Sequence, residues 1–166
     1  METNTFYNSY EQAYQDLPVK WYEKEVNRDW AFVLSALAIM FPFVISILIS
    51  IKEQQIYDSQ IWASAISLYY FSSALLFDKY TTYKGFSLSD KLEDKKIESP
   101  ISELNLDLQH VTTANEYLNS VVRYKDVIAL LLSVLPILGI PMATQRVLAG
   151  LNNMRVIHRV ENAYNR

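Results

Sequence analysis

Residues with catalytic potential are few in this chain, and none of them forms an enzyme motif. His110 and His158 lie far apart, and neither has further metal ligands at a zinc-like spacing. We interpret His110 and Asp107, three positions before it, as a surface pair and not as a base with its orienting carboxylate. The chain has no cysteine, which excludes thiolate nucleophiles and disulfides. No serine-hydrolase, HExxH or phosphate-loop motif is present. We therefore expect a protein that is not an enzyme and needs no cofactor or metal.

Serine is the remaining polar residue that could line a site within the apolar part of the chain. Four serines cluster in the uncharged run 61–77, where they could line a pore: Ser64, Ser67, Ser72 and Ser73. The same run places small or hydroxyl-bearing residues at spacings of four, three and four: Ala63, Ser67, Tyr70 and Ala74. Small residues at helical spacing let a neighbouring helix approach closely in a membrane. We favour this helix-packing face over a pore lining.

The elements that must carry these residues are long uncharged runs. The run 30–51 has no ionisable side chain; as a helix it extends roughly 33 Å, enough to cross a hydrocarbon core. The run 61–77 lies at the short end of the spanning range. The segment 52–60 between them is so short that it can only reverse the chain, which makes the two runs antiparallel. Aromatic side chains expected at the membrane interface are Trp21, Trp30 and Trp62. Residues 30–77 therefore predict a transmembrane hairpin.

A third apolar run, 127–145, is interrupted by Pro136, Gly139 and Pro141. It predicts either a kinked third span or a re-entrant segment. A third span leaves ten of the 15 Lys and Arg residues on the side of the N-terminus, whereas re-entry leaves fourteen there. The positive-inside rule places this side in the cytoplasm and the segment 52–60 outside. We take the kinked span as the first expectation and re-entry as the alternative.

Amphipathic segments are expected outside the membrane. Residues 1–29 form an aromatic N-terminal segment, and 146–166 a basic C-terminal helix. The polar cytoplasmic segment 78–126 includes a heptad helix at 100–122. The seam of that helix, for a homo-oligomer or a cytosolic protein partner, is formed by Leu104, Leu108, Val111, Asn115 and Leu118.

Together these patterns predict an all-α integral membrane protein. The chain resembles the small polytopic membrane components of bacterial anti-phage defence operons, either Kiwa-type or two-span effectors. The resemblance lies in the order of the hairpin, the size of the chain and the FDKY sequence at 77–80. The resemblance implies a sensor or anchor at the bacterial inner membrane. We expect a self-assembling subunit that contacts lipid and docks a partner. A net charge of −3 argues against direct nucleic-acid binding. The alternatives are a pore-forming or membrane-perturbing effector, or a toxin-immunity membrane protein similar in build to colicin-type immunity proteins.

Overall fold

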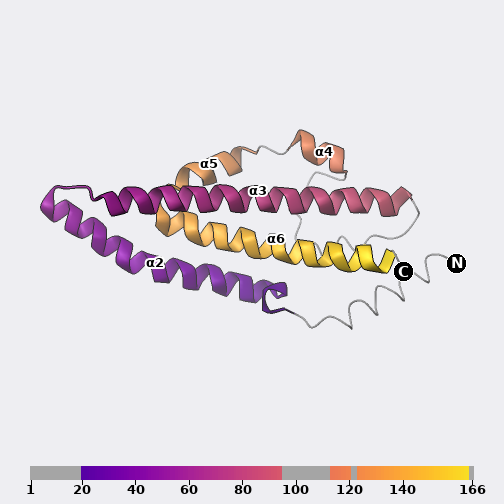
Figure 1. Ribbon diagram of the computed structural model, residues 1–166, viewed down its shortest axis with the longest axis horizontal. Helices are drawn as coiled ribbons and strands as arrows, with labels where there is room; N and C mark the ends of the chain where they lie inside the picture. The colour runs from indigo at the N-terminus through magenta and orange to yellow at the C-terminus, as the bar shows by residue number, and fades with distance from the viewer. Residues whose placement is uncertain (1–19, 95–112, 121–122, 165–166) are drawn as a thin grey trace. The chain divides into compact units, whose positions relative to one another are not determined.

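The computed structural model describes residues 20–94, 113–120 and 123–164, and within these ranges every regular element is helical (Figure 1). This confirms the predicted all-helical class. In chain order the elements are η1 (Trp21–Glu23), α2 (Glu25–Glu53), α3 (Asp58–Asp94), α4 (Ala114–Asn119), α5 (Tyr124–Leu132) and α6 (Pro136–Tyr164).

The chain divides into two compact units, and α3 and α6 each contribute one part to both. Unit 1 consists of Met1–Lys24, Asp78–Val121 and Ala149–Arg166, and unit 2 of Glu25–Phe77 and Val122–Leu148.

In unit 2, α2 and the first part of α3 form a hairpin whose two helices diverge from the turn that joins them (Figure 1). The turn between them includes Gln54, which has a positive φ of 53°. Pro42 lies inside α2 without ending it, although proline removes one backbone donor. Both helices are longer than the predicted runs: α2 begins at Glu25, and α3 continues past residue 77 to Asp94.

The third apolar run is not one helix. It is divided between α5, which ends at Leu132, and α6, which begins at Pro136. Between the two helices the chain reverses direction (Figure 1). Proline disfavours helical geometry in the residue before it and suits the first position of a new helix. The run 127–145 therefore forms two helices and not the single kinked span that was predicted, and re-entry into a membrane stays a prediction. Pro141, by contrast, is accommodated inside α6.

The core of unit 2 is formed by α3, α5 and α6. Phe71 and Ala74 from α3 pack against Ala143 from α6, and all three are at most 1% exposed. Partly buried neighbours surround this core: Tyr70, Leu75, Ala129, Leu130, Met142 and Val147. The only residue of α2 that is buried is Arg28. The described residues therefore leave most of the apolar surface of α2 uncovered.

In unit 1, α3 continues as a helix to Asp94, through the first part of the predicted polar segment 78–126. Its buried Phe86 packs against Tyr117 of α4, with ring centroids 5.3 Å apart. The Asp90 carboxylate accepts a hydrogen bond of 3.0 Å from the backbone N–H of Ala114. This contact helps fix the beginning of α4.

Two helix boundaries in unit 1 differ from the predictions. Of the helix expected over 100–122, residues 100–112 lie outside the described residues; in the described part Thr113 is extended and caps α4, which ends at Asn119. The predicted C-terminal helix at 146–166 is not a separate element, because α6 runs without a break from Pro136 to Tyr164. The N-terminal aromatic pattern falls mainly on residues 1–19, which lie outside the described residues.

Candidate membrane-contacting surface

The largest feature available for function is the apolar surface of α2. This helix has 29 residues, and none of the eighteen that form its most apolar stretch is buried. Among the described residues it is the one helix long and apolar enough to cross a membrane. The second predicted span lies in α3, which does not meet this criterion. The serines and tyrosines of 61–77 make that segment less apolar than 30–51.

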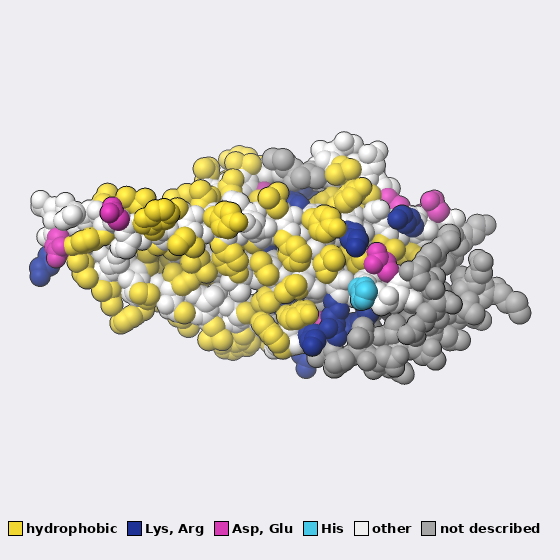
Figure 2. Space-filling model, in the orientation of Figure 1, with side chains coloured by type: hydrophobic (Ala, Val, Ile, Leu, Met, Phe, Trp, Pro, Cys, Tyr) yellow, Lys and Arg dark blue, Asp and Glu magenta, His cyan; other side chains and the backbone are white. Residues whose placement is uncertain are grey.

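Charged side chains of unit 2 lie outside its long apolar runs. Residues 30–51, 59–77 and 127–145 contain no Asp, Glu, Lys, Arg or His. In the face shown in Figure 2, hydrophobic side chains cover most of unit 2, and charged side chains lie where α2 and α3 are joined. An apolar belt that ends in charged groups is the surface pattern that a lipid bilayer requires.

The three predicted interface tryptophans are all exposed. Trp21, Trp30 and Trp62 retain 55%, 60% and 68% of their accessible surface. Trp30 lies near the beginning of α2 and Trp62 near the beginning of α3. Their exposure leaves the indole rings available to lipid headgroups, and their role as membrane anchors remains a prediction.

The predicted small-residue face of α3 packs inside the chain. Ser67 is fully buried, and its Oγ donates a 2.7 Å hydrogen bond to the backbone carbonyl of Ser133, which follows α5. Ala74 is also buried, whereas Tyr70 and Ala63 are half-buried. The structure therefore places Ser67 at an intrachain contact and away from any pore lining. Ser72, on the same helix, donates to the carbonyl of Leu68.

Gly139 permits the close packing at this point. A Cβ atom added to it would lie 2.2 Å from Ser67 Oγ, 2.4 Å from the carbonyl oxygen of Ser133 and 2.9 Å from Ser133 Cα. These distances are shorter than side-chain atoms tolerate, and two of the three atoms belong to the backbone. Only glycine fits where α6 passes the end of α5.

Gln60 joins the two helices of the hairpin close to their turn. Its Nε2 lies 2.8 Å from Ser46 Oγ, 2.7 Å from Ser50 Oγ and 3.1 Å from the Ser46 carbonyl oxygen. Its Oε1 accepts from the backbone N–H of Tyr57 at 3.4 Å, at the beginning of α3. One side chain therefore caps α3 and contacts two serines of α2.

We expect Gln60→Leu to loosen the hairpin, because interhelical hydrogen bonds in membranes contribute about 0.6 kcal/mol on average and up to about 1.7 kcal/mol. Spin labels on cysteines replacing Leu34 and Leu76, both exposed, would report the distance between the arms. The distance distribution should broaden in Gln60→Leu. Gln55→Leu, at an exposed position in the turn, should leave it unchanged. Equal distributions in both variants would contradict the bridging role of Gln60.

A second polar contact of unit 2 joins α5 to α6. Arg146 Nη2 lies 3.2 Å from Asp126 Oδ1, and the Asp126 side chain is 7% exposed. The Arg146 guanidinium also lies over the Phe71 ring, 5.4 Å from its centroid. A cation over an aromatic face gains electrostatic energy in addition to the ion pair. Arg146 thereby connects the first turn of α5 to the apolar core.

Unit 1 contains a largely buried group of three charges. Glu23 Oε1 lies 2.5 Å from Arg155 Nε, and Glu23 Oε2 lies 2.9 Å from Arg159 Nη2. Glu23 Oε1 also accepts from the backbone N–H of Lys20 at 2.8 Å. The side chains of Glu23, Arg155 and Arg159 are 10%, 15% and 2% exposed. The carboxylate joins the segment before α2 to the C-terminal part of α6.

The predicted heptad seam is described only in part. Asn115 and Leu118 lie on α4, and both are exposed in the single chain. The residue of α4 that is buried is Tyr117. Leu104, Leu108 and Val111 lie outside the described residues. Oligomerisation through this seam stays a prediction.

Several residues that make polar contacts within unit 1 or within unit 2 were not predicted from the sequence: Glu23, Gln60, Asp126, Arg146, Arg155 and Arg159. Their partners are distant along the chain, and no regular spacing connects them. The four arginines spread over 146–166 were interpreted only as part of a basic C-terminal helix. Gly139 was noted as a helix interruption, and its role in close packing became apparent only from the neighbouring backbone.

Within the described ranges, no group of three or more His, Cys, Asp or Glu side chains is arranged to hold a metal ion. Comparisons with protein-family models, with curated proteins and with solved structures found no match to this chain.

Proposed function

We propose that this chain is a non-enzymatic integral membrane protein in which unit 2 lies in the bilayer and unit 1 lies in the cytoplasm. The observation that carries the proposal is α2, a long helix whose apolar surface the described residues leave uncovered. Burial of apolar area stabilises by about 25 cal/mol per Å². An exposed surface of this kind is therefore strongly unfavourable in water and favourable in lipid.

The composition of unit 1 supports a particular topology. The segments before α2, after residue 77 and after residue 148 all belong to this one compact unit. A compact unit lies on one side of a membrane, so the chain between these segments must return to the side from which it left. α2 and α3 would do so as a hairpin, and α5 with the first part of α6 as a re-entrant segment. This arrangement gives the fourteen-to-one distribution of Lys and Arg favoured by the positive-inside rule.

Cysteine labelling tests this topology on a background that has no native cysteine. Ser59→Cys, in the first turn of α3, should react with a membrane-impermeant maleimide on intact cells. Asn119→Cys and Asn162→Cys should react only after lysis. All three positions are exposed. Labelling of the cysteines at 59 and 119 from the same side of the membrane would contradict the hairpin. Labelling of the cysteine at 162 from outside the cell would contradict re-entry. Extraction of the chain by alkaline carbonate would contradict integral membrane insertion.

In this proposal the chain is a membrane anchor that presents unit 1 to a protein partner or to further copies of itself. The exposed Leu118 and Asn115 on α4 support such a docking role. The resemblance in hairpin order and size supports a place among the components of a bacterial defence system at the inner membrane. Native mass spectrometry of the detergent-solubilised chain would show the number of copies, and a monomer would contradict self-assembly.

A further inference from the structure

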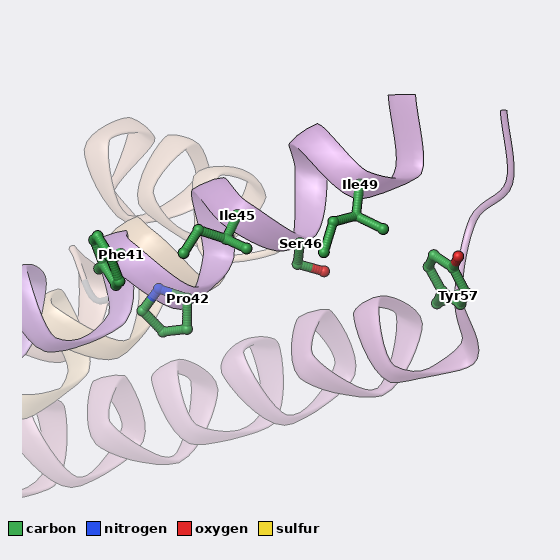
Figure 3. A pocket seen from close by; sticks show the side chains of 6 residues that line it. All are labelled: Phe41, Pro42, Ile45, Ser46, Ile49 and Tyr57. Atoms are coloured by element: carbon green, nitrogen blue, oxygen red, sulfur yellow. The ribbon is translucent and has the colours of Figure 1, made fainter. Parts of the chain in front are cut away.

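We propose that a groove along α2 holds one acyl chain of a membrane phospholipid. The groove has a volume of about 510 Å³ and is lined by Phe41, Pro42, Ile45, Ser46, Ile49 and Tyr57. Figure 3 shows five of these side chains along α2, with Tyr57 facing them from the turn before α3. All of the lining residues belong to unit 2. This inference rests on the proposed insertion of unit 2 in lipid.

The polar groups of the groove are already engaged within the chain. Ser46 Oγ and the Ser46 carbonyl both contact the amide of Gln60. The Tyr57 hydroxyl donates to the Glu53 carboxylate. The remaining lining is aliphatic or aromatic. A bound water needs two to four polar partners, so the groove favours an apolar occupant that makes no hydrogen bonds.

The shape and position of the groove fit a chain whose polar end lies at the membrane surface. The groove is open to its surroundings, so an acyl chain can enter it from the side in lipid. Tyr57 closes the groove at the end where α2 and α3 are joined (Figure 3), next to the charged side chains Lys52, Glu53 and Asp58. A phospholipid can leave its headgroup beside these charges and extend one acyl chain along Ile49 and Ile45 toward Phe41. The mixed signs of the three charges indicate no preference for a particular headgroup, so the acyl chain is the recognised part.

The proposal is tested by lipid retention in a matched pair of variants. Ile45→Trp fills the groove, whereas Ile47→Trp makes the same change on the same helix outside it. The two isoleucines are 41% and 39% exposed. The full chain is purified in a mild detergent, depleted of lipid and incubated with dioleoylphosphatidylcholine. Native mass spectrometry then measures how much lipid stays bound at a detergent concentration that removes loosely associated lipid.

We expect the unmutated chain and Ile47→Trp to retain one phospholipid, and Ile45→Trp to retain at least tenfold less. Equal retention by the two variants, or no retention by the unmutated chain, would overturn the groove. A diazirine-bearing phosphatidylcholine used with the unmutated chain provides a second measurement that needs no substitution. Its cross-links should concentrate in the peptide spanning 41–57, and cross-links spread evenly over α2 would contradict the site. Resistance to carbonate extraction is measured for all three proteins, so that failure of membrane insertion is distinguished from failure of the groove.

Discussion

Glu23→Gln should lower the stability of unit 1 by about 3–5 kcal/mol, the usual effect of removing one partner from a buried ion pair. Glu23 is the carboxylate shared by Arg155 and Arg159, and the Arg159 side chain is only 2% exposed. The amide of glutamine can still accept a hydrogen bond, but it cannot compensate two guanidinium charges in a poorly solvated position. The expected loss therefore comes from charge and not from a change of shape.

Hydrogen exchange is the appropriate measurement, because unfolding of a chain with two units need not be a single transition. Protection of the amides in 149–160 of α6 should fall by about 100-fold or more, which corresponds to about 3 kcal/mol. Glu161→Gln is the matched control. Its pair with Lys84 has a separation of 3.7 Å and side-chain exposures of 37% and 38%, so the expected loss is at most about 1 kcal/mol. Similar losses in both variants would show that burial does not strengthen the contacts of Glu23.

The sequence predicts best the features that depend on apolar composition and on the spacing of nearby residues. The uncharged run 30–51 predicts a long apolar helix, because its composition alone determines whether it suits lipid. The spacing of Ala63, Ser67, Tyr70 and Ala74 predicts a helix-packing face. In the structure Ser67 and Ala74 are buried within the chain, and a contact of this face with another copy stays a prediction. The sequence could not show that the partner helices belong to the same chain. That information depends on the reversal between α5 and α6.

The continuation of α3 beyond residue 77 was missed because its buried face is largely polar. Thr82, Phe86 and Ser89 are buried at spacings of four and three. A search for apolar periodicity finds only Phe86 among them. Threonine and serine are compatible with burial when a backbone carbonyl accepts their hydroxyl group. Counting small polar residues as interior positions would have extended the predicted helix.

The ion pairs of Glu23 were missed for a different reason. Glu23 and Arg159 are separated by 136 positions, and no periodicity connects residues at such a distance. The sequence shows only that the charges of the basic C-terminal segment must be paired with carboxylates or exposed to solvent. The tertiary fold determines which carboxylate the arginines contact.

Gly139→Ala should destabilise unit 2 by about 1–3 kcal/mol, the usual cost of overpacking a well-packed site. The new methyl group would lie 2.4 Å from the Ser133 carbonyl oxygen and 2.9 Å from Ser133 Cα. Alanine is favoured over glycine in a helix interior by about 1 kcal/mol, so steric exclusion must exceed this gain for the variant to lose stability. Because the obstructing atoms belong to the backbone, the steric overlap can be removed only if α5 and α6 move apart.

Variants at Ser67 distinguish the steric effect of Gly139→Ala from the effect of losing a hydrogen bond. Ser67→Ala removes the bond to the Ser133 carbonyl and should cost about 0.5–1.5 kcal/mol. The double variant Gly139→Ala with Ser67→Ala removes only the 2.2 Å contact with Ser67 Oγ and leaves both contacts with Ser133 in place. Its thermal unfolding midpoint in detergent micelles should therefore remain well below that of Ser67→Ala alone. Recovery of the double variant to the midpoint of Ser67→Ala would mean that the Ser67 side chain, and not the backbone where α5 meets α6, requires glycine at position 139.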